Sequence, residues 1–199
     1  MAARMARASG LAAVLLTGSA QAATVTFQTI EPSGRVLDSV VLTLMPVGKA
    51  ALPPPRPASI QQVRKTFVPL VSVVQTGAAV DFPNNDTVRH HVYSFSASKV
   101  FELKLYAGTP ARPVVFDKPG VVVLGCNIHD KMVAYIMVVD TPWFAVTGDD
   151  GSAKITDLPS GDYMLQTWHP RRLGMSDLPS RPIRVSADMT ESVTIDLKP

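Results

Sequence analysis

Short runs of apolar residues, many of them alternating with polar residues, follow one another along the whole chain and are separated by Gly, Pro, Asn and Asp. An alternation with period two is typical of half-buried β-strands, and Val, Ile and Thr favour strands. The strands expected from this pattern cover residues 25–28, 40–44, 67–74, 80–82, 92–95, 101–105, 113–116, 121–124, 133–139, 163–168, 183–185 and 193–197. No convincing amphipathic helix accompanies them. The pattern predicts an all-β protein.

A proline-rich segment interrupts these strands early in the chain. Residues 52–58 hold four prolines in seven positions, a composition typical of an extended linker, which we place at residues 49–59. Between residues 60 and 140 about eight short strands follow at the spacing of a β-sandwich. This central stretch is therefore expected to form a domain of its own.

The first 22 residues have the pattern of a signal peptide. Arg4 and Arg7 precede an apolar run from Leu11 to Leu16, and Ala20-Gln21-Ala22 is a small-x-small cleavage site. The run is shorter than the roughly 20 residues of a transmembrane helix, and no later segment reaches that length without a charge or a proline. We expect cleavage after Ala22 and export to the periplasm of a chain that does not span the membrane. An uncleaved membrane anchor is the alternative.

The net charge limits the classes of partner. The chain carries a formal charge of +3, and removal of residues 1–22 with their two arginines leaves +1. A nucleic-acid-binding domain presents a strongly basic face. We therefore expect no nucleic acid among the partners.

The one cysteine lies in the segment Cys126–Met132, which also contains His129. A thiolate, an imidazole and a thioether, each three residues from the next, suit a type 1 copper site with two His, one Cys and a weak axial Met. A lone thiol in an exported protein has no internal disulfide partner, and a bound metal would protect it from oxidation. A buried, unreactive cysteine is the alternative, but it leaves the His and Met spacing unexplained.

The second imidazole must come from elsewhere, and His90 and His91 are the candidates. Neighbouring residues of a strand point to opposite faces of the sheet, so the two side chains cannot both face one metal ion.

Residues 80–139 resemble the cupredoxins, in particular plastocyanin and amicyanin. The resemblance rests on the Cys-x2-His-x2-Met spacing, on a glycine six residues before the cysteine, and on an Asn-Asn-x4-His-x-Val pattern. The residues concerned are Asn84, Asn85, His90, Val92, Gly120, Cys126, His129 and Met132. The resemblance implies a cupredoxin-like sandwich over residues 60–140 that binds one type 1 copper per chain through His90, Cys126, His129 and Met132, with His91 as the alternative to His90.

The chain also departs from these families. Arg89 replaces the usual proline, Val122 and Leu124 replace aromatic residues before the cysteine, and Asp130 stands where amicyanin has proline. These changes concern the redox potential and the docking surface and leave the ligand set intact. Groups outside the ligand set must orient the imidazoles. The nearest polar candidates are Asn84, Asn85 and Asn127, with solvated loop asparagines as the alternative interpretation.

The rest of the chain resembles the carboxypeptidase-regulatory-like sandwich. Its Asp-x-Gly and Leu-Pro-x-Gly-x-Tyr patterns occur at residues 149–151 and 158–163, and residues 25–46 resemble its opening strands. This implies a second, small β-sandwich built from residues 23–48 and 141–199, with the cupredoxin domain inserted into a surface loop. The whole arrangement is similar to exported cupredoxin-type proteins of methylamine utilization.

The resemblance implies a periplasmic carrier of single electrons between redox partners, such as a cytochrome c or a dehydrogenase. Copper delivery or storage without a redox partner is the alternative, and a structural module that has lost its metal is a third. A closed set of four ligands favours electron transfer, because a delivery protein needs an exchangeable site. Catalysis is not expected, since a copper nitrite reductase would need a second copper with histidines of its own.

Overall fold

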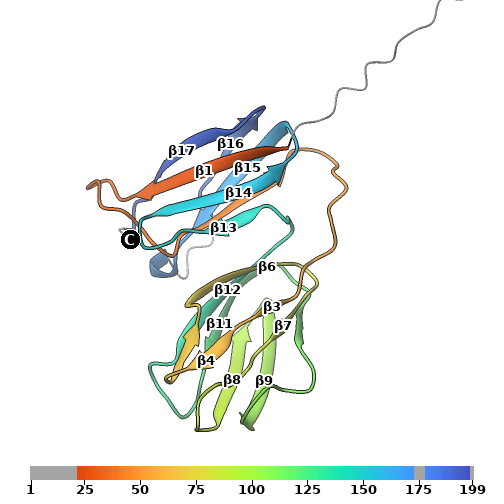
Figure 1. Ribbon diagram of the computed structural model, residues 1–199, viewed down its shortest axis with the longest axis vertical. Coiled ribbons are helices and arrows are strands. Elements are labelled where there is room, and N and C mark those ends of the chain that lie inside the picture. The colour runs from red at the N-terminus through yellow and green to blue at the C-terminus, as the bar shows by residue number, and fades with distance from the viewer. Residues whose placement is uncertain (1–21, 173–177, 198–199) are drawn as a thin grey trace, which may run out of the picture.

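The computed structural model describes residues 22–172 and 178–197, which form β-strands, loops and one short 3-10 helix, η1 (Pro170–Arg172) (Figure 1). The strands are β1 (Ala23–Ile30), β2 (Val41–Pro46), β3 (Ala58–Ser59), β4 (Gln61–Val63), β5 (Thr66–Val68), β6 (Val71–Gln75), β7 (Ala78–Asp81), β8 (His90–Ser96), β9 (Lys99–Tyr106), β10 (Val114–Phe116), β11 (Gly120–Gly125), β12 (Val133–Val139), β13 (Phe144–Val146), β14 (Ser152–Leu158), β15 (Gly161–Trp168), β16 (Ser180–Val185) and β17 (Met189–Thr194). The predicted fold class is confirmed as all-β, with a larger sandwich and a second, small one.

The second sandwich, which we call the terminal sandwich, consists of β1, β2 and β13–β17. Its two sheets have the strand orders β14-β1-β17 and β13-β2-β15-β16. The alternation along β1 explains the packing, because Val25 and Phe27 are fully buried while the residues between them are half-buried. They share one core with residues of the facing sheet such as Leu44 and Leu165.

The other sandwich, which we call the central sandwich, consists of β3–β12. A five-stranded sheet of order β6-β12-β11-β8-β9 faces a smaller sheet of order β10-β7-β3, and the β4–β5 hairpin lies beside them. Its core joins Val92, Leu124 and Ile136 of the large sheet to Val80 and Phe116 of the small one. β3 uses the last two residues of the segment predicted as linker, because they pair in parallel with β7.

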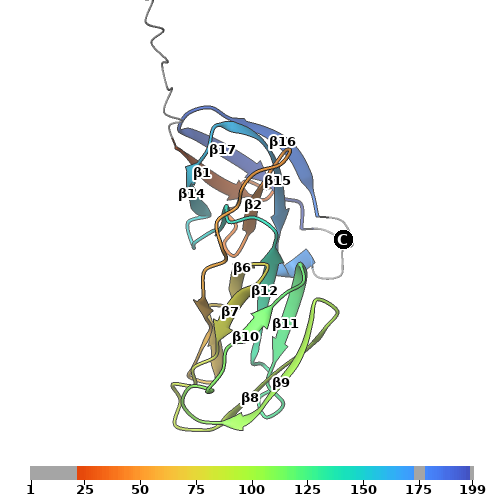
Figure 2. The ribbon, with the colours of Figure 1, turned by 90° about the vertical axis from the view of Figure 1, so that its right-hand side faces the viewer.

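The two sandwiches lie one above the other in both views (Figure 1, Figure 2). A buried apolar cluster joins them, with Val41 and Trp168 on the terminal side and Met137 and Val139 on the central side. The Trp168 ring packs against Tyr135 with 5.8 Å between the ring centroids. This cluster attaches the terminal sandwich to the end of the central sandwich where β12 finishes. The loop that precedes β12 therefore lies at the opposite end of the central sandwich.

Two predictions concern the membrane and export. In the part of the chain that the structure describes, no helix is long and apolar enough to cross a bilayer. The signal peptide predicted for residues 1–22 lies, apart from Ala22, outside the described residues.

The cluster between the sandwiches should contribute strongly to stability. Trp168 is only 4% exposed, and truncation of a buried tryptophan costs about 3–5 kcal/mol. We expect Trp168→Ala to lower the free energy of unfolding, measured by urea denaturation, by about that amount. Phe95 is 80% exposed, so the control Phe95→Ala should change the free energy of unfolding by less than about 0.5 kcal/mol. Equal losses in the two variants would contradict the role of the cluster.

His169 should make stability depend on pH. Its burial and the nearby Arg171 lower the pKa of the imidazole, and the Arg171 amide donates to Nδ1 at 3.1 Å. The folded state therefore holds the neutral ring, whereas the unfolded state protonates it near pH 6.5. The contribution of His169 to the free energy of unfolding is therefore fully present above about pH 6.5 and is lost as the pH falls below that value. We expect His169→Asn, which keeps an acceptor, to lose less stability than the wild type between about pH 8 and pH 5.5 in urea denaturation. Parallel profiles would refute this.

Candidate metal centre

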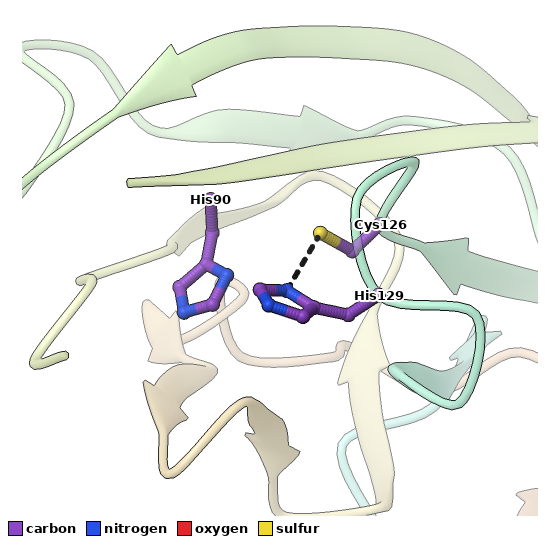
Figure 3. Close-up of side chains that lie close together, drawn as sticks. All are labelled: His90, Cys126 and His129. Carbon is purple, nitrogen blue, oxygen red and sulfur yellow. Dashed lines mark hydrogen bonds between the residues drawn. The ribbon is translucent and has the colours of Figure 1, made fainter. Parts of the chain in front are cut away.

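Three donor side chains converge at the end of the central sandwich that lies away from the terminal sandwich. His90 is the first residue of β8, and Cys126 and His129 lie in the loop between β11 and β12. One ring nitrogen of each histidine and Sγ of the cysteine all lie within 4.8 Å of one another (Figure 3). Nitrogen and sulfur ligands lie about 2.0–2.3 Å from an ion such as zinc, so a small closure would let the three donors surround one metal.

The orientation of His90 is fixed inside the core. The side chain is fully buried, and Nε2 lies 2.8 Å from Oδ2 of Asp86. A carboxylate only accepts hydrogen bonds, so Nε2 carries a proton, and in the neutral ring Nδ1 keeps its lone pair. Nδ1 is buried and has no hydrogen-bond partner among the described residues. It points toward Cys126 and His129 (Figure 3). A buried lone pair of this kind fits a metal ligand.

The loop from Cys126 to Met132 folds tightly on itself. The Met132 amide donates to the His129 carbonyl at 2.9 Å, which closes the loop, and Cys126 Sγ lies 3.8 Å from His129 Nδ1 (Figure 3). Cys126 and Met132 are buried in the core of the central sandwich, at 5% and 1% exposure. His129 is half-buried. The structure thus brings three of the four predicted ligands together and buries the fourth, Met132, in the same core.

Asp86 is held by more than His90. Its carboxylate accepts hydrogen bonds from the amides of Arg64 at 2.6 Å and Lys65 at 2.8 Å. Burial by itself would raise the pKa of Asp86, but the hydrogen bonds from Lys65, His90 and Arg64 outweigh it and leave the pKa lowered. The carboxylate is therefore an anion at neutral pH. Asp86 was not among the site residues predicted from the sequence, although an acidic residue four positions before His90 was a usable signal.

The three asparagines proposed to orient the imidazoles differ in their surroundings. Asn84 is buried, donates to the Val88 and Tyr106 carbonyls at 2.9 Å each, and accepts the Asp86 amide at 3.0 Å. It therefore braces the loop that carries Asp86 and leads to His90. Asn85 instead donates to Gln61, and Asn127 is exposed.

His91 lies on the other face of β8. Its Nε2 is 2.8 Å from Oε1 of Glu102, and its ring stacks near Tyr93 with 5.5 Å between the centroids. The alternation that forbade both histidines from facing one metal ion is therefore present in the structure. His90, and not His91, lies beside Cys126 and His129.

Tyr106 lies opposite His90 in the register of β8 and β9. Burial raises the pKa of its hydroxyl to about 12, and the hydroxyl donates to the Phe82 carbonyl at 2.6 Å. The phenol stays neutral at ordinary pH and ties the end of β9 to the loop after β7.

The chemistry of these donors limits which metal ions fit the site. A thiolate with two imidazole nitrogens suits copper or zinc, whereas calcium and magnesium prefer oxygen. The residues present therefore fit a copper ion of the kind implied by the cupredoxin resemblance.

Solved structures similar to this chain include copper proteins. A copper-containing nitrite reductase from Thermus scotoductus SA-01 has 28% sequence identity and a TM-score of 0.39 over 47% of this chain, which spans 25% of the reductase chain. A purple cupredoxin from Nitrosopumilus maritimus has 24% identity and a TM-score of 0.36, with 41% of this chain and 98% of that chain covered. A mutant of amicyanin in its reduced Cu(I) form has 15% identity and a TM-score of 0.37, with 49% and 97% covered. No model of a known protein family matches the chain, and no curated protein matches it.

Proposed function

We propose that the chain is an exported type 1 copper protein that carries single electrons between redox partners in the periplasm. The observation that carries the proposal is the convergence of the buried Nδ1 of His90 with Cys126 and His129. The Nδ1 of His91 is also buried without a hydrogen-bond partner among the described residues, but His91 does not belong to this group of donors. A buried polar atom without a partner is costly, so a metal ion is the group that the site favours there.

The proposed ligands are His90, Cys126, His129 and Met132, with one copper per chain. Copper bound there would supply a one-electron couple between Cu(II) and Cu(I). The chain holds the donors in one arrangement: His90 is locked by Asp86, and the loop is closed by the Met132 amide. Donors that are fixed before the electron arrives need little rearrangement when it does, which favours rapid transfer.

The partner proposed is another redox protein, such as a cytochrome c or a dehydrogenase. His129 is the one of the three converging donors that is partly exposed, and its neighbour Ile128 is 47% exposed. We propose that the partner docks at this end of the central sandwich. That the chain is not itself an enzyme stays a prediction.

We also propose that the terminal sandwich is of the carboxypeptidase-regulatory-like kind and that the chain resembles proteins of methylamine utilization. Two details support the motif assignment. In the Leu-Pro-x-Gly-x-Tyr segment, the Tyr163 hydroxyl donates to the Pro159 carbonyl at 2.7 Å. In the Asp-x-Gly turn, Gly151 has φ of +71° and lies against the Thr29 carbonyl, where a Cβ would be only 2.8 Å from that oxygen.

Addition of Cu(II) to the purified chain tests the proposed site. We expect one copper per chain and an intense visible absorption from thiolate-to-copper charge transfer, measured by optical spectroscopy and metal analysis. Cys126→Ser and His90→Ala should lose the absorption, whereas the matched control His91→Ala should keep it. Tight copper binding without the absorption, or absorption that survives Cys126→Ser, would instead favour copper delivery or storage. Absorption that survives His90→Ala but not His91→Ala would show that His91 is the ligand.

Met132→Leu tests the axial thioether. A Leu-for-Met exchange in a core usually costs less than about 1.5 kcal/mol, so the fold should persist. The axial ligand of such a site tunes its potential. Loss of the lone pair of Met132 removes negative charge density that stabilises the doubly charged ion more than the singly charged one, so the reduction potential should rise. We expect about a tenfold change in the ratio of the two affinities, or roughly 59 mV for a one-electron couple, measured by spectroelectrochemistry. Met137→Leu, in the cluster between the sandwiches, is the control and should leave the potential unchanged. An unchanged potential in Met132→Leu would exclude Met132 as a ligand.

A further inference from the structure

Two adjacent histidines, His90 and His91, each form an ion-pair contact of 2.8 Å with a carboxylate. Only one of these carboxylates, Asp86, is held rigidly from several sides. We propose that Asp86 is a positioning residue of the metal centre, which fixes the tautomer of His90 and lowers the reduction potential of the bound metal. This inference rests on the proposed function, since the potential is that of the proposed copper site.

The first step concerns the proton of His90. The imidazole is fully buried, so each ring nitrogen must find a partner inside the protein. With the proton on Nε2, Asp86 accepts it and Nδ1 presents a lone pair to Cys126 and His129. With the proton on Nδ1, the Nε2 lone pair would face a carboxylate oxygen at 2.8 Å, which is repulsive. Asp86 therefore selects the tautomer that can bind metal through Nδ1.

The second step concerns the carboxylate. The turn of the β4–β5 hairpin places the amides of Arg64 and Lys65 on its two oxygens. Both residues have left-handed backbone conformations, with φ of +52° and +60°, which are unfavourable outside glycine. Hydrogen bonds to an ionised acceptor are stronger than those to a neutral one and offset this cost. The hairpin turn is thus shaped around Asp86.

A third contact fixes the backbone of Asp86. Its own amide donates to Asn84 Oδ1 at 3.0 Å, and the Asn84 side chain is anchored to the carbonyls of Val88 and Tyr106. The side chain of Asp86 is 14% exposed. Neither the backbone nor the carboxylate is free to turn away from His90, so the negative charge stays one imidazole ring away from the metal position.

The consequence is electrostatic. Reduction adds one electron, supplied by the redox partner, to the metal, and no bond to His90 or Asp86 is formed or broken. A fixed negative charge stabilises the doubly charged ion more than the singly charged one. A carboxylate bonded to the far nitrogen of a ligand imidazole also makes that imidazole a stronger donor. Both effects favour Cu(II) and lower the potential.

Glu102 offers a matched control on the other face of β8. It pairs with His91 at the same 2.8 Å, but its side chain is 54% exposed, so solvent screens its charge. Asp86→Asn and Glu102→Gln each replace a carboxylate by an amide of the same shape and remove one negative charge. A difference between them reports the surroundings of the carboxylate, namely its buried charge and the hydrogen bonds from Arg64 and Lys65 that an amide keeps only in part, and not the mere loss of a charge.

We expect Asp86→Asn to raise the reduction potential of the copper-loaded chain by roughly 59 mV, which corresponds to a tenfold shift of the affinity ratio toward Cu(I). Its Cu(II) affinity should fall about 10–100-fold, as is typical when the partner of a ligand imidazole is removed. Glu102→Gln should change the affinity ratio less than about twofold. Spectroelectrochemistry and competition with a chelator measure the two quantities. Equal shifts in the two variants, or no shift in Asp86→Asn, would overturn the proposal.

A measurement on the wild type does not depend on how the variants fold. Nitrogen-15 chemical shifts of the metal-free chain should show His90 protonated on Nε2, and a neutral ring protonated on Nδ1 alone would overturn the role of Asp86. A wild type that binds copper without thiolate absorption would refute the proposed function. In that case the tautomer measured in the metal-free chain would still show whether Asp86 orients His90. Failure of the proposed function and failure of this inference therefore give different results.

Discussion

A fully buried imidazole with one nitrogen bonded to a carboxylate is the constraint on which this end of the molecule depends. Inside a packed sandwich a polar atom without a partner is costly. Asp86 satisfies Nε2 of His90, and the Arg64–Lys65 turn and Asn84 hold Asp86 in place. The remaining ring nitrogen faces Cys126 and His129. The β4–β5 hairpin places Phe67 in the core, and its turn also helps to orient the candidate ligand.

The same strand shows how two identical side chains acquire different roles. His90 and His91 are adjacent in β8, and each contacts a carboxylate at the same distance. Alternation turns the first into the core beside Cys126 and the second to the outer face, where Tyr93 and the exposed Glu102 surround it. Both imidazoles are buried, so the face of the sheet on which each ring lies, and the side chains found there, separate the candidate ligand His90 from His91.

The two ends of the central sandwich differ in what their strands carry. At one end, the cluster around Trp168 and Met137 joins the central sandwich to the terminal sandwich. At the other end, β8 begins and the loop between β11 and β12 turns, and there the donors converge. β12 links the two, since it starts directly after Met132 and ends in the apolar cluster. The rigid sheet therefore separates the candidate metal site from the attached sandwich.

The all-β class, the two sandwiches and the local spacing of Cys126, His129 and Met132 could be predicted from the sequence, because period-two alternation and a seven-residue loop are local properties. β14 was missed, since only Ala153 and Ile155 carry its alternation before two exposed polar residues, Thr156 and Asp157, interrupt it. Only the tertiary structure decided which histidine faces Cys126, that Asp86 is its partner, and that Asn127 is exposed. The amides that hold Asp86 come from residues more than 20 positions away. Contacts of that kind depend on how strands pair across the fold, and no spacing along the chain encodes them.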